Sequence, residues 1–280
     1  MDSSRSYDIV FLALARDCAK TIPSALRALE YLEASGLSVH AIIGENGSKD
    51  STRALLNHHL VTAVDTSMMG RADNRLERMA IGRQIVADHS ESVNARAFGV
   101  VDLDEPFLTA LTVNQLRAAF DRLHEVFAVA ASSAPTYYDL LAFEDLNGDG
   151  FIGLDDRILK STRNPLSYYT LFRDTIYPAQ GKLTSDGDLW CTSAFNGLCI
   201  YDADAYRAGS YLPVDTGKWI CEHITFNRSV TTATGKSMVV DGSLVLPMPA
   251  EHGTRSLPGF VWQRAKKLPG RVLANWQNRV

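Results

Sequence analysis

Asp8–Ala15, which reads DIVFLALA, is a nearly continuous apolar run that ends in small residues. Such a run is typical of a strand that is buried on both faces of a parallel sheet. Two similar runs lie further along the chain, VHAIIG at Val39–Gly44 and AFGVVDL at Ala97–Leu103. These three runs predict the central strands of one sheet.

Helical patterns separate the three predicted strands. Apolar residues recur at helical spacing from Ile22 to about Glu33, and Pro23 falls in the first turn, where proline is tolerated. Two more helices are predicted at residues 51–58 and 73–87. The order strand, helix, strand, helix, helix, strand predicts an α/β fold whose parallel strands are joined by right-handed crossovers.

The second half of the chain is less regular. Strands are predicted at Val126–Ala131 and Gly197–Tyr201, and Ser237–Leu246 is typical of a hairpin that turns at Asp241-Gly242. Loops punctuated by proline and glycine lie between them, and they favour one continuous unit over a second independent domain.

The charge is unevenly distributed along the chain. The net charge is −4, but residues 252–280 carry six basic residues and no acidic one, which leaves 22 basic and 32 acidic residues before them. A free-standing nucleic-acid binder is therefore not expected, because its basic surface would dominate the domain. Four cysteines without CxxC spacing, no long apolar run and no signal-peptide pattern together predict a cytoplasmic protein with reduced thiols.

Polar residues follow each of the three buried runs. Arg16-Asp17 follows the first, Glu45–Asp50 the second, and Asp102, Asp104 and Glu105 end the third. Because ligands bind at the carboxyl ends of parallel strands, these clusters predict one concave site.

Asp102 and Asp104 are two residues apart on a strand, so their side chains share one face. Two adjacent carboxylates repel each other unless a cation or a raised pKa relieves them, and hard oxygen ligands favour Mg²⁺ or Mn²⁺ shared with substrate phosphates. The alternative is a solvated strand end before the turn at Pro106.

The same residues carry a resemblance to a known family. Arg16, ENGSKDST at Glu45–Thr52, Arg83-Gln84 and VVDLDE resemble the donor half of a GT-A fold glycosyltransferase. Followed by PTYYDLLAFED, SAFNGLCIYDADAY and CEHITFN, this order is similar to the cryptococcal capsule-type mannosyltransferases and their bacterial relatives. Family members often have an Arg-Asp pair where this chain has Glu144-Asp145.

The resemblance implies one GT-A domain over residues 1–280, with a Rossmann-like mixed sheet flanked by helices. Residues 1–105 would form the nucleotide-sugar-binding half, residues 106–250 an irregular acceptor-binding half, and residues 251–280 a basic C-terminal tail. The basic tail, with Trp262 and Trp276, is expected either to lie on an anionic membrane near a lipid-linked acceptor or to pack as a solvated helix.

The resemblance also implies roles for individual residues. Arg83 would contact the diphosphate or the sugar, Asp102 the ribose or sugar, and Asp104 the metal that neutralises the leaving diphosphate. Asn196 and Gly197 would shape the sugar pocket, although a plain turn is an alternative for this pair. The implied nucleotide-sugar-binding residues are Ala13, Ala15, Arg16, Glu45, Asn46, Asp50, Arg83, Asp102, Asn196 and Gly197.

Glu222, in the sequence Cys221-Glu222-His223, is the catalytic candidate beside Asp104. If the anomeric centre is inverted, Glu222 would take the proton of the acceptor hydroxyl, and if configuration is retained it would steady the sugar or acceptor. His223 and His252 are rival candidates for a third metal ligand.

An acidic segment at Asp145–Asp156 fits the EF-hand calcium loop. The expected ligands are Asp145, Asn147, Asp149, the carbonyl of Phe151 and Asp156, with Gly150 at position six. Aspartate at position twelve is shorter than the usual glutamate. A bound Ca²⁺ would pin this loop near the acceptor, and the alternative is an exposed turn.

These observations favour a glycosyltransferase that depends on Mn²⁺ or Mg²⁺ and transfers a hexose, with GDP-mannose as one candidate donor and UDP-sugars as others. The acceptor would be a glycan or a lipid-linked molecule. Two other hypotheses remain open: a nucleotidyltransferase, although residues 15–18 lack its phosphate loop, and a calcium-stabilised carbohydrate-binding or scaffold protein with a degenerate transferase fold.

Overall fold

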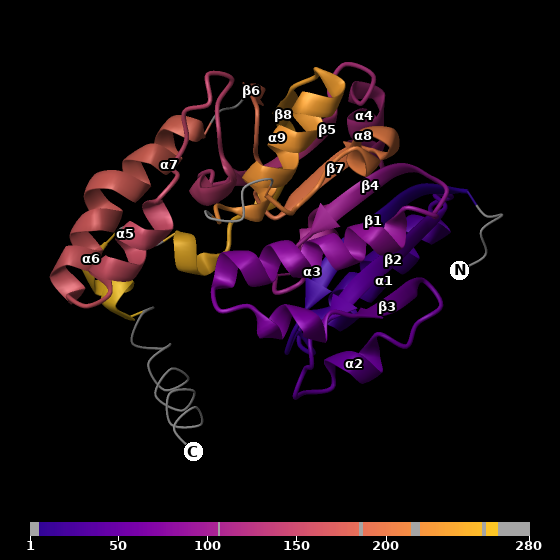
Figure 1. The fold of residues 1–280 in the computed structure, drawn as a ribbon, viewed down its shortest axis with the longest axis horizontal. Helices are drawn as coiled ribbons and strands as arrows, with labels where there is room; N and C mark the ends of the chain where they lie inside the picture. Colours follow the sequence, from indigo (N-terminus) through magenta and orange to yellow (C-terminus); the bar gives the residue numbers. More distant parts are fainter. Residues whose placement is uncertain (1–5, 106, 185–186, 214–218, 254–255, 263–280) are drawn as a thin grey trace.

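The computed structural model describes residues 6–105, 107–184, 187–213, 219–253 and 256–262 (Figure 1). Within these ranges, strands from both halves of the chain form one mixed sheet in the order β3-β2-β1-β4-β7-β5-β8-β6. β7 is antiparallel to β4 and β5, β6 is antiparallel to β8, and the other neighbours are parallel. The strands are β1 (Tyr7–Ala15), β2 (Val39–Glu45), β3 (Val61–Asp65), β4 (Ala95–Val101), β5 (Ala128–Ala134), β6 (Leu189–Cys191), β7 (Leu198–Asp202) and β8 (Met238–Pro247).

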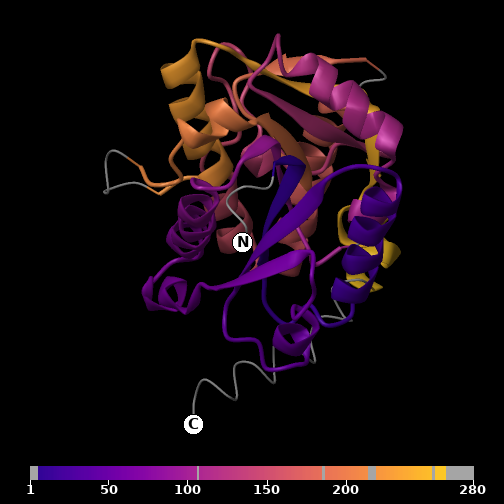
Figure 2. The ribbon, with the colours of Figure 1, turned by 90° about the vertical axis from the view of Figure 1, so that its right-hand side faces the viewer.

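Helices cover both faces of this sheet, so the predicted mixed α/β fold with flanking helices is confirmed (Figure 2). One apolar core includes side chains of α3 and α9, and a second core includes side chains of α1 and α4. No helix in the described part of the chain is long and apolar enough to cross a membrane. The helices are α1 (Ile22–Ala34), α2 (Thr52–Leu55), α3 (Arg75–Ser90), α4 (Val113–Arg122), α5 (Leu154–Ser161), α6 (Pro165–Leu171), α7 (Tyr177–Leu183), α8 (Ala203–Arg207) and α9 (Glu222–Thr234).

Helices α1 and α3 begin close to where the sequence predicts. Proline occupies the first turn of α1, where its missing N–H is not needed. The side chain of Asn74 caps α3 by accepting a hydrogen bond from the backbone N–H of Glu77. The buried face of α3 includes Arg83 as well as apolar residues, which is unusual for a helix that packs on a sheet.

Two predicted elements differ from the structure, and one strand was missed. The predicted hairpin at 237–246 is wrong, because this segment is the single strand β8, whose register with β5 shifts after Asp241. Asp241 accepts hydrogen bonds from Ser243, so the Asp-Gly turn chemistry produces an irregularity within the strand. Strand β3 was not predicted, and the helix expected over 51–58 spans only Thr52–Leu55.

Helices α5, α6 and α7 form a block beside the sheet, at the left of Figure 1. Phe260 packs against the rings of Tyr168, Tyr169 and Phe172, so the described part of the chain after residue 255 is attached to this block.

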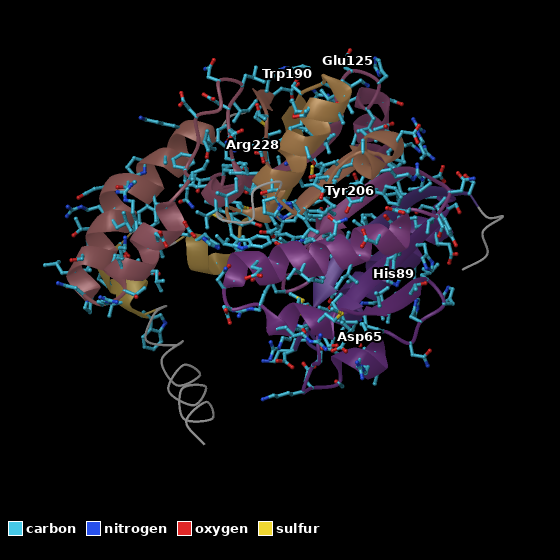
Figure 3. All side chains as sticks on the ribbon, in the orientation of Figure 1. Asp65, His89, Glu125, Trp190, Tyr206 and Arg228 are labelled. Atoms are coloured by element: carbon cyan, nitrogen blue, oxygen red, sulfur yellow. The ribbon has the colours of Figure 1, made fainter. Side chains whose placement is uncertain are left out.

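The acidic segment is tied to the body of the protein by a buried carboxylate. Glu144 is 2% exposed and accepts two hydrogen bonds from the guanidinium of Arg228 on α9, a residue labelled in Figure 3. The backbone N–H of Glu144 also donates to Ser193. The Glu144 carboxylate therefore has a structural partner in Arg228.

Replacing Arg228 with Ala should lower the free energy of unfolding by about 2 kcal/mol, because it leaves the Glu144 carboxylate buried without its partner. The Arg173–Asp174 pair provides a control, since both side chains are about half exposed. Arg173→Ala should change stability by less than about 0.5 kcal/mol. Urea denaturation of the two variants measures both values, and equal effects would contradict this account of Glu144.

Candidate functional site

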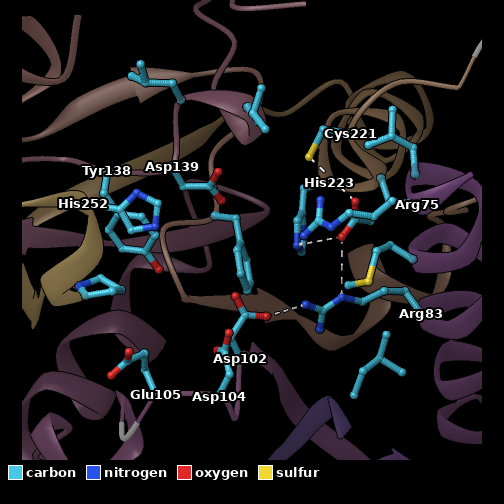
Figure 4. Close-up of a pocket in the computed structure, with 18 of the residues that line it drawn as sticks. Arg75, Arg83, Asp102, Asp104, Glu105, Tyr138, Asp139, Cys221, His223 and His252 are labelled. Atoms are coloured by element: carbon cyan, nitrogen blue, oxygen red, sulfur yellow. Dashed lines mark hydrogen bonds and ion pairs between the residues drawn. The ribbon is translucent and has the colours of Figure 1, made fainter. Parts of the chain in front are cut away.

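A cavity of about 600 Å³ opens at the carboxyl ends of β1, β2 and β4 (Figure 4). Ala15, Arg16, Asn46, Asp102 and Asp104 line the cavity from these strand ends, as the sequence predicts for a parallel sheet. Its volume is that of a small-ligand pocket. The remaining wall comes from α3, α5, the start of α9, the loop at residues 138–141 and the segment at residues 249–252.

Arg83 is the buried cation of this cavity. Its side chain is 4% exposed, and its Nη2 donates to Oδ1 of Asp102 at 2.7 Å. Burial lowers the pKa of Arg83, but the charges of Asp102 and Glu222 outweigh this effect and hold the pKa above its ordinary value. The guanidinium therefore remains charged at every accessible pH.

Two nitrogens of Arg83, Nε and Nη1, have no hydrogen-bond partner within the described residues. Nε lies 4.0 Å from Oε1 of Glu222, beyond hydrogen-bond distance, and the guanidinium lies over the ring of Phe195. Leaving a buried charged donor unpaired is costly, so this arrangement is typical of a binding site and not of a stabilising ion pair.

Opposing effects act on the pKa of the Asp102 carboxyl. Burial raises its pKa to about 6, and the charges of Asp104 and Glu222 act in the same direction, while Arg83 opposes them. Burial and the charge of Asp104 also raise the pKa of Glu105. Negative charge at this strand end therefore exceeds what Arg83 neutralises, which suits a cation.

Glu222 and His223 begin α9 and line the same cavity. Glu222 is 6% exposed, and its Oε1 lies 3.6 Å from Nε2 of His223. The His223 ring stacks on Phe195 at 3.8 Å, and its Nδ1 has no partner within the described residues. Burial, with the charge of Arg83, lowers the pKa of His223 well below its ordinary value, so the ring is neutral at neutral pH.

The described residues contain no group of three His, Cys, Asp or Glu side chains arranged to hold one metal ion. His252 lines the cavity but stacks on Tyr138 at 5.0 Å, and His223 faces Glu222. The ligand roles predicted for these histidines stay predictions. The two carboxylates Asp102 and Asp104 fit a divalent cation that takes its other ligands from a substrate phosphate and water.

The turn at Asn196-Gly197 connects two parts of the cavity. Both residues have positive φ, and a Cβ on Gly197 would come within 2.6 Å of the Tyr138 hydroxyl. The carbonyl of Gly197 accepts from the N–H of Asp102. Oδ1 of the fully buried Asn196 accepts from the N–H groups of Tyr138 and Asp139. This pair therefore positions other residues of the cavity wall and does not line it.

Asp139 is a cavity residue that was not predicted as a site residue. Burial and the charges of Asp102 and Glu222 raise its pKa to about 7, against the opposing effects of a hydrogen bond from the backbone of Ala142 and of the Arg75 charge. Arg75, Arg78 and Tyr138 line the cavity as well. The available signal was the YYD block at Tyr137–Asp139, which was quoted only for the resemblance.

Three of the residues predicted to bind the nucleotide-sugar do not line the cavity. Ala13 is buried within β1, and neither Glu45 nor Asp50 is part of the cavity wall. Glu45 pairs with Arg53, and Asp50 accepts from the N–H groups of Ala19 and Thr52. These bonds fold the loop that carries Asn46 to the cavity. Their direct binding roles stay predictions.

The acidic segment forms a tight loop before α5. Oδ1 of Asp145 accepts from the N–H groups of Asn147 and Asp149, and Gly148 and Gly153 have positive φ. Helix α5 starts at position ten of the predicted EF-hand loop, whereas the described chain before the loop has a short 3₁₀ helix at Leu140–Ala142. The loop thus has the exiting helix of an EF-hand without its entering helix.

No protein-family model matches this chain, and no curated protein matches it. Solved structures show low similarity. The mannosyltransferase PcManGT from Pyrobaculum calidifontis, in complex with GDP-Man and Mn²⁺, is 13% identical with a TM-score of 0.46, over 90% of this chain and 63% of that one. Glucosyl-3-phosphoglycerate synthase from Mycobacterium tuberculosis, in complex with Mn²⁺, UDP and phosphoglyceric acid, is 11% identical with a TM-score of 0.44, over 91% and 73%.

S. aureus TarS 1-349 is 10% identical with a TM-score of 0.44, and the match covers 87% of this chain and 60% of that one. The chain also spans 57% of the length of a mannosyl-3-phosphoglycerate synthase from Rubrobacter xylanophilus. At these identities and scores the similarity does not indicate what this chain binds or which reaction it catalyses.

The raised pKa of Asp139 predicts a pH-dependent stability. Between about pH 4 and pH 7 the folded protein keeps a proton on Asp139 that the unfolded chain has lost, so the free energy of unfolding falls as pH rises through this window. Asp139→Asn removes this titration, so the variant should gain stability relative to the wild type as pH rises. Urea denaturation at pH 4.5 and pH 7.5 measures the change.

Asp121→Asn is the control, because it removes the same charge from a side chain that is 82% exposed. A pH dependence of Asp139→Asn that matched the wild type would show that Asp139 is not held in its protonated form by the fold.

Proposed function

We propose that the protein is a metal-dependent GT-A glycosyltransferase that transfers a hexose from a nucleotide-diphosphate sugar to an acceptor. The observation that carries this proposal is Arg83, a buried guanidinium with two unpaired nitrogens beside the Asp102 and Asp104 carboxylates. A guanidinium fork suits phosphate oxygens, and the neighbouring carboxylates suit the cation that accompanies a diphosphate.

Each part of the cavity has a role in this proposal. Ala15, Arg16 and Asn46 border the nucleoside at the ends of β1 and β2. Asp102 and Asp104 hold Mn²⁺ or Mg²⁺, which supplies neutralisation of the leaving diphosphate. Arg83 binds the diphosphate from the side of α3 and keeps its charge throughout, so it stabilises the leaving group without a proton transfer.

The wall opposite the strand ends supports an acceptor with an apolar portion. Its lining side chains from the 138–141 loop, α5 and the segment at residues 172–176 are Leu141, Leu154, Ile158, Phe172 and Ile176. Apolar lining of this kind suits a lipid-linked acceptor better than a free glycan. The resemblance of the sequence favours a mannose donor, with GDP-mannose as the first compound to test.

The proposed location is the cytoplasm. The suggested contact of the basic C-terminal tail with a membrane stays a prediction, since residues 263–280, which carry most of its charge, lie outside the described residues.

Thermal-shift titration tests the donor site. GDP or UDP with Mn²⁺ should raise the melting temperature of the wild type by several degrees, because a ligand bound at 100 times its Kd contributes about 2.7 kcal/mol. Asp104→Asn should lose the Mn²⁺-dependent part of this shift and the turnover of the donor.

Asp121→Asn is the matched control, since it makes the same change in a side chain that is 82% exposed and does not line the cavity. It should keep the Mn²⁺-dependent shift. The absence of a shift with either nucleotide in the wild type would contradict the proposed function.

We also propose that the loop at Asp145–Asp156 binds Ca²⁺ as a structural ion. Its support is the ligand spacing, the start of α5 at position ten, and the inward-turned Asp145 carboxylate. The tie between Glu144 and Arg228 would then couple the ion to α9.

The double variant Asp145→Asn with Asp149→Asn should abolish the rise in melting temperature that Ca²⁺ causes, because it removes two charged ligands. Asp155→Asn is the control, as position eleven is not a ligand in an EF-hand loop. An unchanged response of the double variant to Ca²⁺, or an equal loss in Asp155→Asn, would identify the loop as an ordinary turn.

A further inference from the structure

Asp139 is a carboxylate of the cavity that forms no ion pair with a described residue, as are Asp104 and Glu105 at the end of β4. Asp102 bonds to Arg83 at 2.7 Å, and Glu222 lies within 4.0 Å of both Arg83 and His223. The ionised form of Asp139 is favoured by a hydrogen bond from the backbone of Ala142 and, at longer range, by the charge of Arg75. Burying part of a carboxylate without a cation partner costs folding free energy. A carboxylate kept in this position is therefore a candidate for ligand binding.

The protein fixes Asp139 firmly despite this cost. The N–H groups of Tyr138 and Asp139 donate to the fully buried Oδ1 of Asn196 at 3.2 and 3.3 Å. The same amide donates to the carbonyl of Ala131 on β5 at 3.2 Å, so the amide is locked at both ends. Asn196 adopts φ of +57°, a conformation that most side chains disfavour. Hydrogen bonds through Asn196 therefore fix the backbone of Asp139 relative to β5.

The direction in which Asp139 points complements the donor site. Figure 4 shows its carboxylate directed into the cavity, between Tyr138 and His223, on the side opposite Asp102 and Asp104. Asp102 and Glu222 are close enough for their charges to act on it. A sugar whose diphosphate lies at Arg83 and Asp104 would have Asp139 across the cavity, beside the apolar wall assigned to the acceptor.

We propose that Asp139 is the acceptor-side anchor of the site, whose carboxylate accepts a hydrogen bond from the acceptor hydroxyl that receives the sugar. This inference rests on the proposed glycosyltransferase function and adds to it the residue that engages the acceptor. Glu222 then acts on the donor side, because it lies beside Arg83 and His223 and holds the guanidinium in place.

The electrostatic setting supports this role. Among the charged groups that face Asp139, Asp102 on the β4 end and Glu222 on α9 raise its pKa, and Arg75 on α3 lowers it. A carboxyl whose pKa is about 7 is partly deprotonated at neutral pH, and its deprotonated form can accept a hydrogen bond from a hydroxyl. A hydroxyl bound there would have its oxygen directed at the sugar.

Donor hydrolysis tests the inference without knowledge of the natural acceptor, because water is the simplest hydroxyl acceptor. A panel of GDP- and UDP-hexoses with Mn²⁺ identifies the compound that the wild type hydrolyses. On that compound, Asp139→Ala should lower kcat about 100-fold, as expected when a charged hydrogen bond that orients the nucleophile is lost. Asp139→Asn should lower kcat about 10-fold, since its amide oxygen still accepts. Both should leave the donor KM within about twofold.

Glu222→Gln is the matched carboxylate variant, and it should raise the donor KM because the Arg83 guanidinium loses its second carboxylate. Asp139→Asn is expected to fold, since it removes the titration that lowers the stability of the wild type as pH rises.

The inference is overturned if Asp139→Ala keeps the wild-type kcat, or if its main effect is a higher donor KM. A wild type that hydrolyses no nucleotide-sugar would overturn the proposed function itself, and the inference with it. If the wild type hydrolyses the donor and Asp139→Ala has the same kcat, the role of Asp139 is contradicted but the proposed function is not.

Discussion

The contact between Arg83 and Asp102 is the interaction on which the rest of the site depends. It joins α3 to the end of β4 at 2.7 Å and brings a full positive charge into a buried position. Burying the Arg83 charge costs several kcal/mol, and its pairing with Asp102, whose side chain is 36% exposed, contributes little net stability. The pair is satisfied at only one guanidinium nitrogen. The burial of Arg83 is therefore better explained by the binding of a ligand with phosphate oxygens than by a contribution of the Arg83–Asp102 pair to the stability of the fold.

The turn at Asn196-Gly197 connects the strand end that carries Asp102 to the opposite wall of the cavity, which carries Asp139. Gly197 bonds to the backbone of Asp102, and Asn196 bonds to the backbone of Asp139. One two-residue turn with positive φ thus sets the separation of the proposed donor and acceptor sides. Catalysis of transfer between two bound molecules depends on such fixed separation, because orientation of the reactants supplies much of the rate increase.

The sequence predicted the strands that are buried on both faces, because β1, β2 and β4 are continuous apolar runs whose character does not depend on their neighbours. Strand β3 was missed, since it lies at the sheet edge and is half exposed, and only its pairing with β2 defines it. The segment at residues 237–246 has local hairpin chemistry, yet β5 and β6 pair with it from both sides and keep it as one strand.

The site residues also divide into those that the sequence could predict and those that it could not. Strand-end residues such as Arg16, Asp102 and Asp104 could be predicted because parallel strands bring their carboxyl ends together. Glu45 was predicted from the same rule, but its carboxylate bonds within its own loop. Asp139 could not be assigned from the sequence, because its position depends on Asn196, which lies 57 residues away in the chain.

The most direct test of the central claim is calorimetric binding of GDP and UDP, each compared with its nucleoside, to the wild type and to Arg83→Lys in the presence of Mn²⁺. Lysine keeps the charge but lacks the planar fork. The account predicts that one diphosphate binds the wild type at least about tenfold more tightly than its nucleoside, and that Arg83→Lys loses most of this difference. Equal diphosphate affinity in the two proteins would contradict it.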